Sequence, residues 1–209
     1  MCRLKSSPAI PAEFCFSLRP ETRVTLRLRA AVQPANAKVL QASPMTMPIT
    51  EDLAQIAFQE RELQLASFDE ETAWRLGSRV RELTVARRLK LVIDVRRVGQ
   101  VLFYSALPGT TPDNIEWVRR KSNVTARFHR SSYAIGLEME EKKSTLLERY
   151  GLPVSEYASH GGSFPLRVLR AGVIGSVTVS GLPQRSDHEL VVEALCLELG
   201  REFDKFRLA

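Results

Sequence analysis

The sequence predicts an α+β fold in which an antiparallel sheet of about five strands is flanked by helices. Two pairs of short β-branched segments, each joined by a tight turn, predict two β-hairpins. Segments with the period of an amphipathic helix stand before, between and after these hairpins. The link within each strand pair is too short for the crossover connection of a parallel, doubly wound sheet.

Two helices are predicted before the first hairpin. The first, over residues 50–65, has apolar side chains at helical spacing. Asp69 can cap the second helix with its carboxylate. The apolar stripe of this second helix consists of Ala73, Leu76, Val80 and Leu83. Residues 91–95 and 101–104 then predict the two strands of the first hairpin, with Gly99 at the turn.

Further helices and the second hairpin are predicted in the remainder of the chain. Thr111 can cap a helix that has Pro112 at its first position and runs to about residue 127. Residues 132–142 favour another helix. The strands of the second hairpin are residues 164–169 and 173–180.

The last predicted helix spans residues 187–203. Ser186 and Glu189 match the capping box, in which a hydroxyl and a carboxylate three residues later satisfy the first backbone N–H groups. The apolar face of this helix is wide, and we therefore expect it to be buried against the sheet or against a second subunit.

The composition, with 44% hydrophobic and 26% charged residues, is ordinary for a soluble globular protein. No apolar run approaches the ~18 residues that cross a bilayer, so we expect no membrane partner. Residues 1–46 hold seven basic and two acidic side chains and carry +5 of the net charge of +6. The rest of the chain is nearly neutral, which argues against a nucleic-acid partner.

Residues 1–46 also contain five prolines and no sustained apolar period, and we expect them to be a disordered basic tail. Three explanations are open: an organellar transit peptide, a flexible basic arm, or upstream sequence translated from a misassigned start. The change in composition at Met45–Met47 favours the last, and residues 47–209 then form the domain. Cys196 is the only cysteine of that domain, which predicts a buried thiol and a reducing, cytoplasmic location.

The domain contains several long motifs. They are Ile93–Arg97 (IDVRR), Leu107–Asn114 (LPGTTPDN), Glu116–Lys121 (EWVRRK), His160–Leu166 (HGGSFPL), Gly172–Gly175 (GVIG), Val179–Gly181 (VSG) and Asp187–Glu189 (DHE). Over about residues 49–205 the sequence resembles the GlcG/HbpS-like family, often labelled haem-degrading domain. The PGTTPDN and HGGxFP motifs look like those of a poorly characterised branch of that family.

This resemblance implies a profilin-like α/β sandwich that assembles into homo-oligomers. It also implies haem as a cofactor, because some members of the family bind haem and are proposed to degrade it. Other members are ligand-binding or accessory proteins, and one relative in this branch looks like a partner of protein-targeting machinery.

His160 is the first candidate site residue, because a neutral imidazole can bind haem iron axially or act as an acid–base group. Gly161 and Gly162 follow it and can let a ligand approach the backbone. The alternative is a histidine that only hydrogen-bonds a neighbouring loop, with the glycines serving the turn.

A basic group supplies the second candidate site. Arginine forks bind carboxylates and phosphates, and lysine adds a compact charge, so Arg97, Arg120 and Lys121 are predicted to hold haem propionates or a small anionic metabolite. We expect these three cations and His160 to converge in one cleft. The alternative is a solvated charged face, or ion pairs with nearby carboxylates such as Glu116.

Other chemistry-bearing residues have structural explanations. His188 stands in the first turn of the last predicted helix, and His129 is expected at a surface or helix end. The three histidines show neither HxH nor HExxH spacing, so a dedicated zinc site is not favoured. Tyr104 and Trp117 are expected to be core or interface aromatics.

The sequence therefore favours an oligomeric protein that binds haem or another small anionic ligand. Two alternatives stay open: a protein-interaction or accessory module without a catalytic site, and a haem-degrading enzyme.

Overall fold

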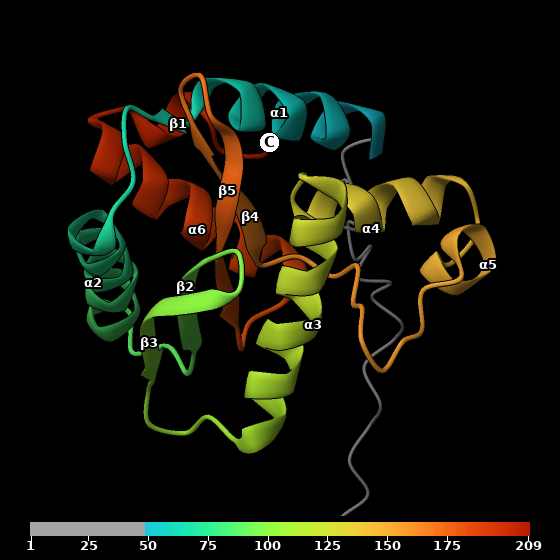
Figure 1. Ribbon diagram of the computed structural model, residues 1–209, viewed down its shortest axis with the longest axis horizontal. Helices are drawn as coiled ribbons and strands as arrows, with labels where there is room; N and C mark the ends of the chain where they lie inside the picture. Colours follow the sequence, from blue (N-terminus) through green and yellow to red (C-terminus); the bar gives the residue numbers. More distant parts are fainter. Residues whose placement is uncertain (1–48) are drawn as a thin grey trace, which may run out of the picture. The chain divides into compact units, whose positions relative to one another are not determined.

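The computed structural model describes residues 49–209, and the predictions for residues 1–46 lie outside them. The described residues form a five-stranded sheet with helices on both faces (Figure 1). The elements are α1 (Ile49–Glu62), β1 (Gln64–Leu65), α2 (Glu70–Ala86), β2 (Val92–Arg97), β3 (Gln100–Ala106), α3 (Pro112–Phe128), α4 (Ser132–Glu141), α5 (Leu146–Tyr150), β4 (Ser163–Val168), β5 (Gly172–Ser180), α6 (Gln184–Leu199) and the 3-10 helix η1 (Phe203–Lys205).

The strand order is β1-β4-β5-β2-β3, and both predicted hairpins are confirmed. β2 also pairs antiparallel with β5, which joins the two hairpins into one sheet. β1, however, runs parallel to β4, with Gln64 opposite Arg167, so the expectation of a purely antiparallel sheet is wrong at this edge. The chain follows β4 for only two residues here, and such a short strand leaves no alternating pattern in the sequence.

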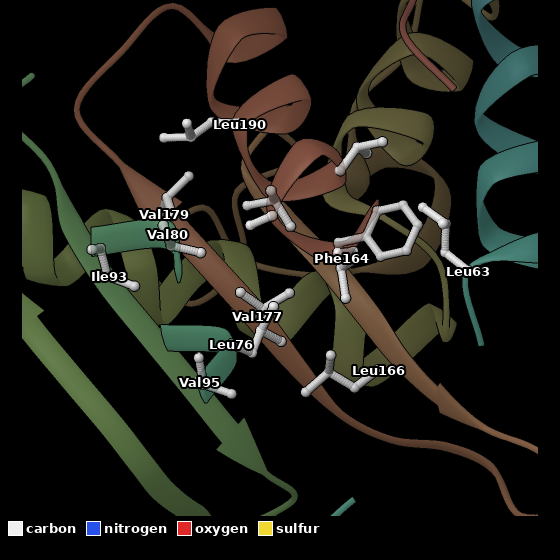
Figure 2. Close-up of a cluster of buried hydrophobic side chains, with 14 of the residues drawn as sticks. Leu63, Leu76, Val80, Ile93, Val95, Phe164, Leu166, Val177, Val179 and Leu190 are labelled. Carbon is white, nitrogen blue, oxygen red and sulfur yellow. The ribbon is translucent and has the colours of Figure 1, made fainter. Parts of the chain in front are cut away.

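The main apolar core lies between one face of the sheet and the helices α2 and α6. Figure 2 shows Ile93, Val177 and Phe164 from three strands in the same buried cluster as Leu76 of α2 and Leu190 of α6. Cys196 is buried in this cluster, as predicted. α3 covers the opposite face, where it packs against β5, β4 and β2.

The start of α3 lies where the sequence predicts it. Pro112 is its first residue, and Asn114 Oδ1 accepts a hydrogen bond from the backbone N–H of Thr111 at 2.8 Å. The side of α3 that faces the sheet contains buried polar residues, among them Lys121, Ser122 and Thr125. The second face of the sheet is therefore covered by a partly polar helix side.

The predicted beginning and end of the last helix are wrong. α6 begins at Gln184, directly after Pro183, and ends at Leu199 instead of residue 203. The expected capping box is absent, because Ser186 lies inside the first turn and Glu189 accepts a hydrogen bond from the backbone N–H of Leu208. A tertiary contact with the C-terminal segment has replaced the local cap. The short α5 and η1 were not predicted.

Within residues 49–209, no helix combines the length and the apolar character that crossing a membrane requires.

Candidate functional site

A recess of about 270 Å³ lies where β5 ends, between the first turns of α3 and the start of α6. We call it the α3–α6 cleft. The residues that line it are Asp113, Asn114, Trp117, Lys121, His160, Ser180, Gly181, Leu182 and Gln184. Two of the predicted site residues, Lys121 and His160, therefore share one cleft although 39 positions separate them in the chain.

His160 lies at the exposed rim of this cleft. Its ring packs edge-on against Trp117, with 5.0 Å between the ring centroids, and its backbone carbonyl accepts a hydrogen bond from Ser132 Oγ at 2.6 Å. Partial burial lowers the pKa of His160 below its ordinary value, and the positive charges of Lys121 and Arg120 lower it further. The imidazole is therefore neutral at pH 7, with a lone pair available to a metal or a proton.

Lys121 lines the cleft and pairs with Asp187, which is not among the lining residues. The two side chains are almost fully buried, and Lys121 Nζ lies 2.8 Å from Asp187 Oδ2 and 3.3 Å from the carbonyl oxygen of Val179. Burial lowers the pKa of Lys121 and raises that of Asp187, while the attraction between the two charges opposes both shifts. The positive charge of Lys121, which the sequence analysis assigned to ligand binding, is therefore already compensated by the carboxylate of Asp187.

Gly161 and Gly162 serve close packing of the backbone. A Cβ atom at position 161 would lie 2.0 Å from the carbonyl oxygen of Gln184, and one at position 162 would lie 2.4 Å from that of Val179. Gly162 also has φ +125°, which disfavours a side chain. The two glycines let the His160 loop pack closely against the backbone of α6 and β5. The space that the sequence analysis assigned to a ligand is therefore filled by protein backbone.

Arg120 lies behind Trp117, outside the residues that line the cleft. Its guanidinium stacks over the indole at 4.2 Å from the ring centroid. Its two hydrogen bonds, to the carbonyl oxygens of Glu116 and Val154, are long at 3.4 and 3.3 Å. The neighbouring Arg119, in contrast, is bound to the carboxylates of Glu116 and Glu156. Among the described residues, no carboxylate pairs with Arg120 beside the cleft.

Arg97 does not join this group. It lies at the end of β2 and donates a hydrogen bond to Glu70 at 2.6 Å. It lines a different recess, of about 220 Å³, which it shares with His129 and Asn123. The predicted convergence is therefore wrong for Arg97, because β2 ends at the opposite end of α3 from the cleft.

The other two histidines lie outside the residues that line the cleft, and only His129 has the surface, helix-end position that the sequence predicts. His129 is exposed at the C-terminal cap of α3 with φ 54°. His188 is buried, and its Nε2 lies 2.8 Å from Gln59 Oε1. Asn114 and Ser180 belong to the LPGTTPDN and VSG motifs, but neither they nor Gln184 were predicted as site residues, since no local pattern links α3, β5 and α6.

Residues 49–209 contain no group of three or more His, Cys, Asp or Glu side chains that could hold a metal ion.

A five-stranded sheet with helices on both faces defines the class of α+β fold to which this chain belongs. The Ybr137w crystal structure shares it, with a TM-score of 0.68 and 26% identity over 73% of this chain and 92% of that one. The crystal structure of the PduOC–haem complex shares it with a TM-score of 0.54 and 14% identity, over 62% of this chain and 94% of that one.

The sequence comparison is more specific. A UPF0303 protein of Acidobacterium capsulatum is 62% identical over 78% of this chain and 98% of its own length. The sequence model for the family described as haem degrading protein HbpS-like matches residues 68–196. The chain belongs to this HbpS-like family, which confirms the resemblance read from its motifs.

Proposed function

We propose that this protein binds haem at the α3–α6 cleft, with the imidazole of His160 as the axial ligand. One observation carries the proposal. Among the described residues, nothing hydrogen-bonds the ring nitrogens of His160, which is neutral at the rim of the cleft. Beside it lie the indole of Trp117 and the guanidinium of Arg120, and no carboxylate of the described residues pairs with Arg120. The description of the family and the haem complex of a structural neighbour support the same ligand.

The cleft and Arg120 beside it fit an iron macrocycle in three respects. His160 offers an unprotonated nitrogen, since its pKa is lowered. Trp117 offers an apolar ring surface, and Arg120 offers a cation for a propionate. The recess of about 270 Å³ lies below the range of about 300–1,000 Å³ that encloses drug-sized ligands. A haem at this site would therefore stay largely open to solvent.

In this proposal each residue has a separate task. His160 would hold the iron and Arg120 would neutralise a propionate, while the Lys121–Asp187 pair holds α3 and α6 at a fixed spacing. Bound haem supplies a redox-active iron that can bind a further ligand. A haem-degrading activity would in addition need a reductant, and loss of the haem spectrum with release of a product would show it.

The size of the cleft also favours a second candidate, a small anionic metabolite in place of haem. Arg120 would then bind the carboxylate or phosphate of the ligand, and His160 would donate or accept one hydrogen bond. The accessory-module alternative needs neither residue, so a partner that is captured equally well by the His160→Ala and Arg120→Ala variants would favour it.

A haem titration tests the leading proposal. We expect the wild-type protein to shift the Soret band of added haem, and His160→Ala to weaken binding at least tenfold, which corresponds to about 1.4 kcal/mol. His129→Asn is the matched control, because His129 is exposed outside the cleft and its left-handed backbone suits asparagine. Absence of a shift in the wild type, or an equal shift in His160→Ala, would contradict the proposal.

A further inference from the structure

The free edge of the sheet is formed by β3. Among the described residues β3 pairs only with β2, and its sequence, QVLFYSA, contains no charged residue, proline or glycine. Native sheets protect exposed edges with charges, prolines or bulges, because unpaired backbone groups invite another strand. In the β3 of this sheet the only such device is a bulge at Leu102, and Phe103–Ala106 continue in regular register with Val92–Val95.

The hydrogen-bond pattern shows which backbone groups of β3 point outward. The backbone N–H of Leu107 donates to the carbonyl oxygen of Leu91 at 3.0 Å, in continuation of the β2–β3 register. Hydrogen-bonded and non-hydrogen-bonded pairs alternate along an antiparallel ladder, so Tyr104 and Asp94 form a non-hydrogen-bonded pair. The N–H and C=O groups of Tyr104 therefore point away from β2, toward the free edge.

Apolar side chains accompany these outward backbone groups. Tyr104 is 45% exposed, and Trp74 of α2, which is 61% exposed, packs edge-on against Phe103 with 5.7 Å between the ring centroids. Gly77 brings α2 close to β3, because a Cβ atom there would lie 2.3 Å from the Phe103 ring. The edge thus has an aromatic side chain on each face of the sheet.

We propose that β3 pairs with β3 of a second copy of this chain, around a twofold axis that passes between the two Tyr104 residues. A twofold axis perpendicular to the sheet keeps each side chain on its own face, so Tyr104 would face Tyr104 of the second copy and exchange two backbone hydrogen bonds with it. The two five-stranded sheets would become one continuous sheet.

Charge favours a second copy over an unrelated strand. α2 begins with Glu70 and Glu71, and the chain directly after it carries Arg87 and Arg88. Glu70 already pairs with Arg97, and Arg87 with Glu193, whereas Glu71 and Arg88 have no ion-pair partner among the described residues. The twofold axis would place the two α2 helices antiparallel on the same face of the sheet. The acidic start of each helix would then lie beside the basic end of the other, which is the arrangement that the helix dipoles also favour.

The first test changes the residue on the axis. In the wild type we expect a dimer, or an even-numbered oligomer, in sedimentation equilibrium. Tyr104→Lys places two like charges opposite each other and should weaken this association at least tenfold, whereas Tyr104→Phe should preserve it. Leu147→Lys, at an exposed position on α5, is the matched control. A monomeric wild type, or an unchanged mass in Tyr104→Lys, would overturn the proposal.

The second test checks the antiparallel arrangement. Glu71→Lys should weaken association, and adding Arg88→Asp to the same chain should restore it, because the pair of charges is exchanged. Tyr104→Cys should form a disulfide between copies under mild oxidation, identified as a peptide linked to itself, since paired strands bring the Cα atoms to about 5.5 Å. Failure of both the restoration and the symmetric disulfide in an oligomeric wild type would assign the oligomer to another surface.

Discussion

His188 shows at the scale of one residue how burial decides the role of a histidine. The amide nitrogen of Gln59 donates to the carbonyl oxygen of Phe206, so Gln59 Oε1 must accept the proton of His188 Nε2. Nδ1 is then a buried acceptor without a partner among the described residues, and the His188 ring packs against those of Tyr133 and Phe164. Burial lowers the pKa of His188 to about 3, which keeps the ring neutral.

This lowered pKa predicts acid sensitivity. Between pH 6.5 and pH 3 the unfolded chain binds a proton at His188 that the folded chain excludes, so the contribution of this residue to stability is complete above pH 6.5 and is lost as the pH falls. From pH 7 to pH 5 we expect the wild type to lose about 2 kcal/mol more of its free energy of unfolding than His188→Gln. Urea unfolding at the two pH values measures this difference, and equal losses would contradict the assignment.

At the scale of elements, the Lys121–Asp187 pair connects α3 with α6 beside the cleft. Asp187 also accepts a hydrogen bond from the backbone N–H of Leu182, which holds the segment between β5 and α6. Removing one partner of a buried pair leaves an uncompensated charge, and the energetic cost then exceeds the net value of the pair.

We therefore expect Lys121→Met to lower the free energy of unfolding by about 3–5 kcal/mol. Adding Asp187→Asn to the same chain should recover part of this loss, because the amide keeps an acceptor for Leu182 without the charge. Arg119→Met is the control, since its exposed pairs with Glu116 and Glu156 are worth about 1 kcal/mol or less. Similar urea midpoints for Lys121→Met and Arg119→Met would show that the buried pair is not a structural link.

At the scale of the whole molecule, the buried apolar side chains within residues 49–209 form three clusters. The first turn of α1 takes part through Ile49, which packs against the cluster of Ile56 and Tyr133. Because residues 1–46 contain five prolines and no sustained apolar period, we expect the fold of residues 47–209 to need no contribution from them.

A chain that begins at Met47 should consequently keep the cooperative unfolding transition. We expect its Tm to lie within about 3 °C of that of the full chain, which corresponds to about 1 kcal/mol for a domain of this size. Thermal unfolding followed by circular dichroism measures the difference. A larger loss would show that residues 1–46 stabilise the domain.

Much of the fold follows from local patterns. The capping residue Asp69, the Thr111-Pro112 helix start and the β-branched segments of both hairpins each act within a few residues of the chain. The start of α6 could not be predicted in this way, because Glu189 bonds to Leu208 and Ser186 lies within the helix. The same limit applies to β1, whose pairing with β4 depends on residues about 100 positions away.

The sequence by itself determined the longer helices and both hairpins, the histidine before two glycines and the uncharged strand β3, since each of these is a property of neighbouring residues. Only the tertiary structure decided which charges meet. It placed Asp187 against Lys121, stacked Arg120 on an indole and carried Arg97 to Glu70. The physical reason is that electrostatic partners are set by distances through space, which depend on how β2, α3 and α6 pack rather than on their order in the chain.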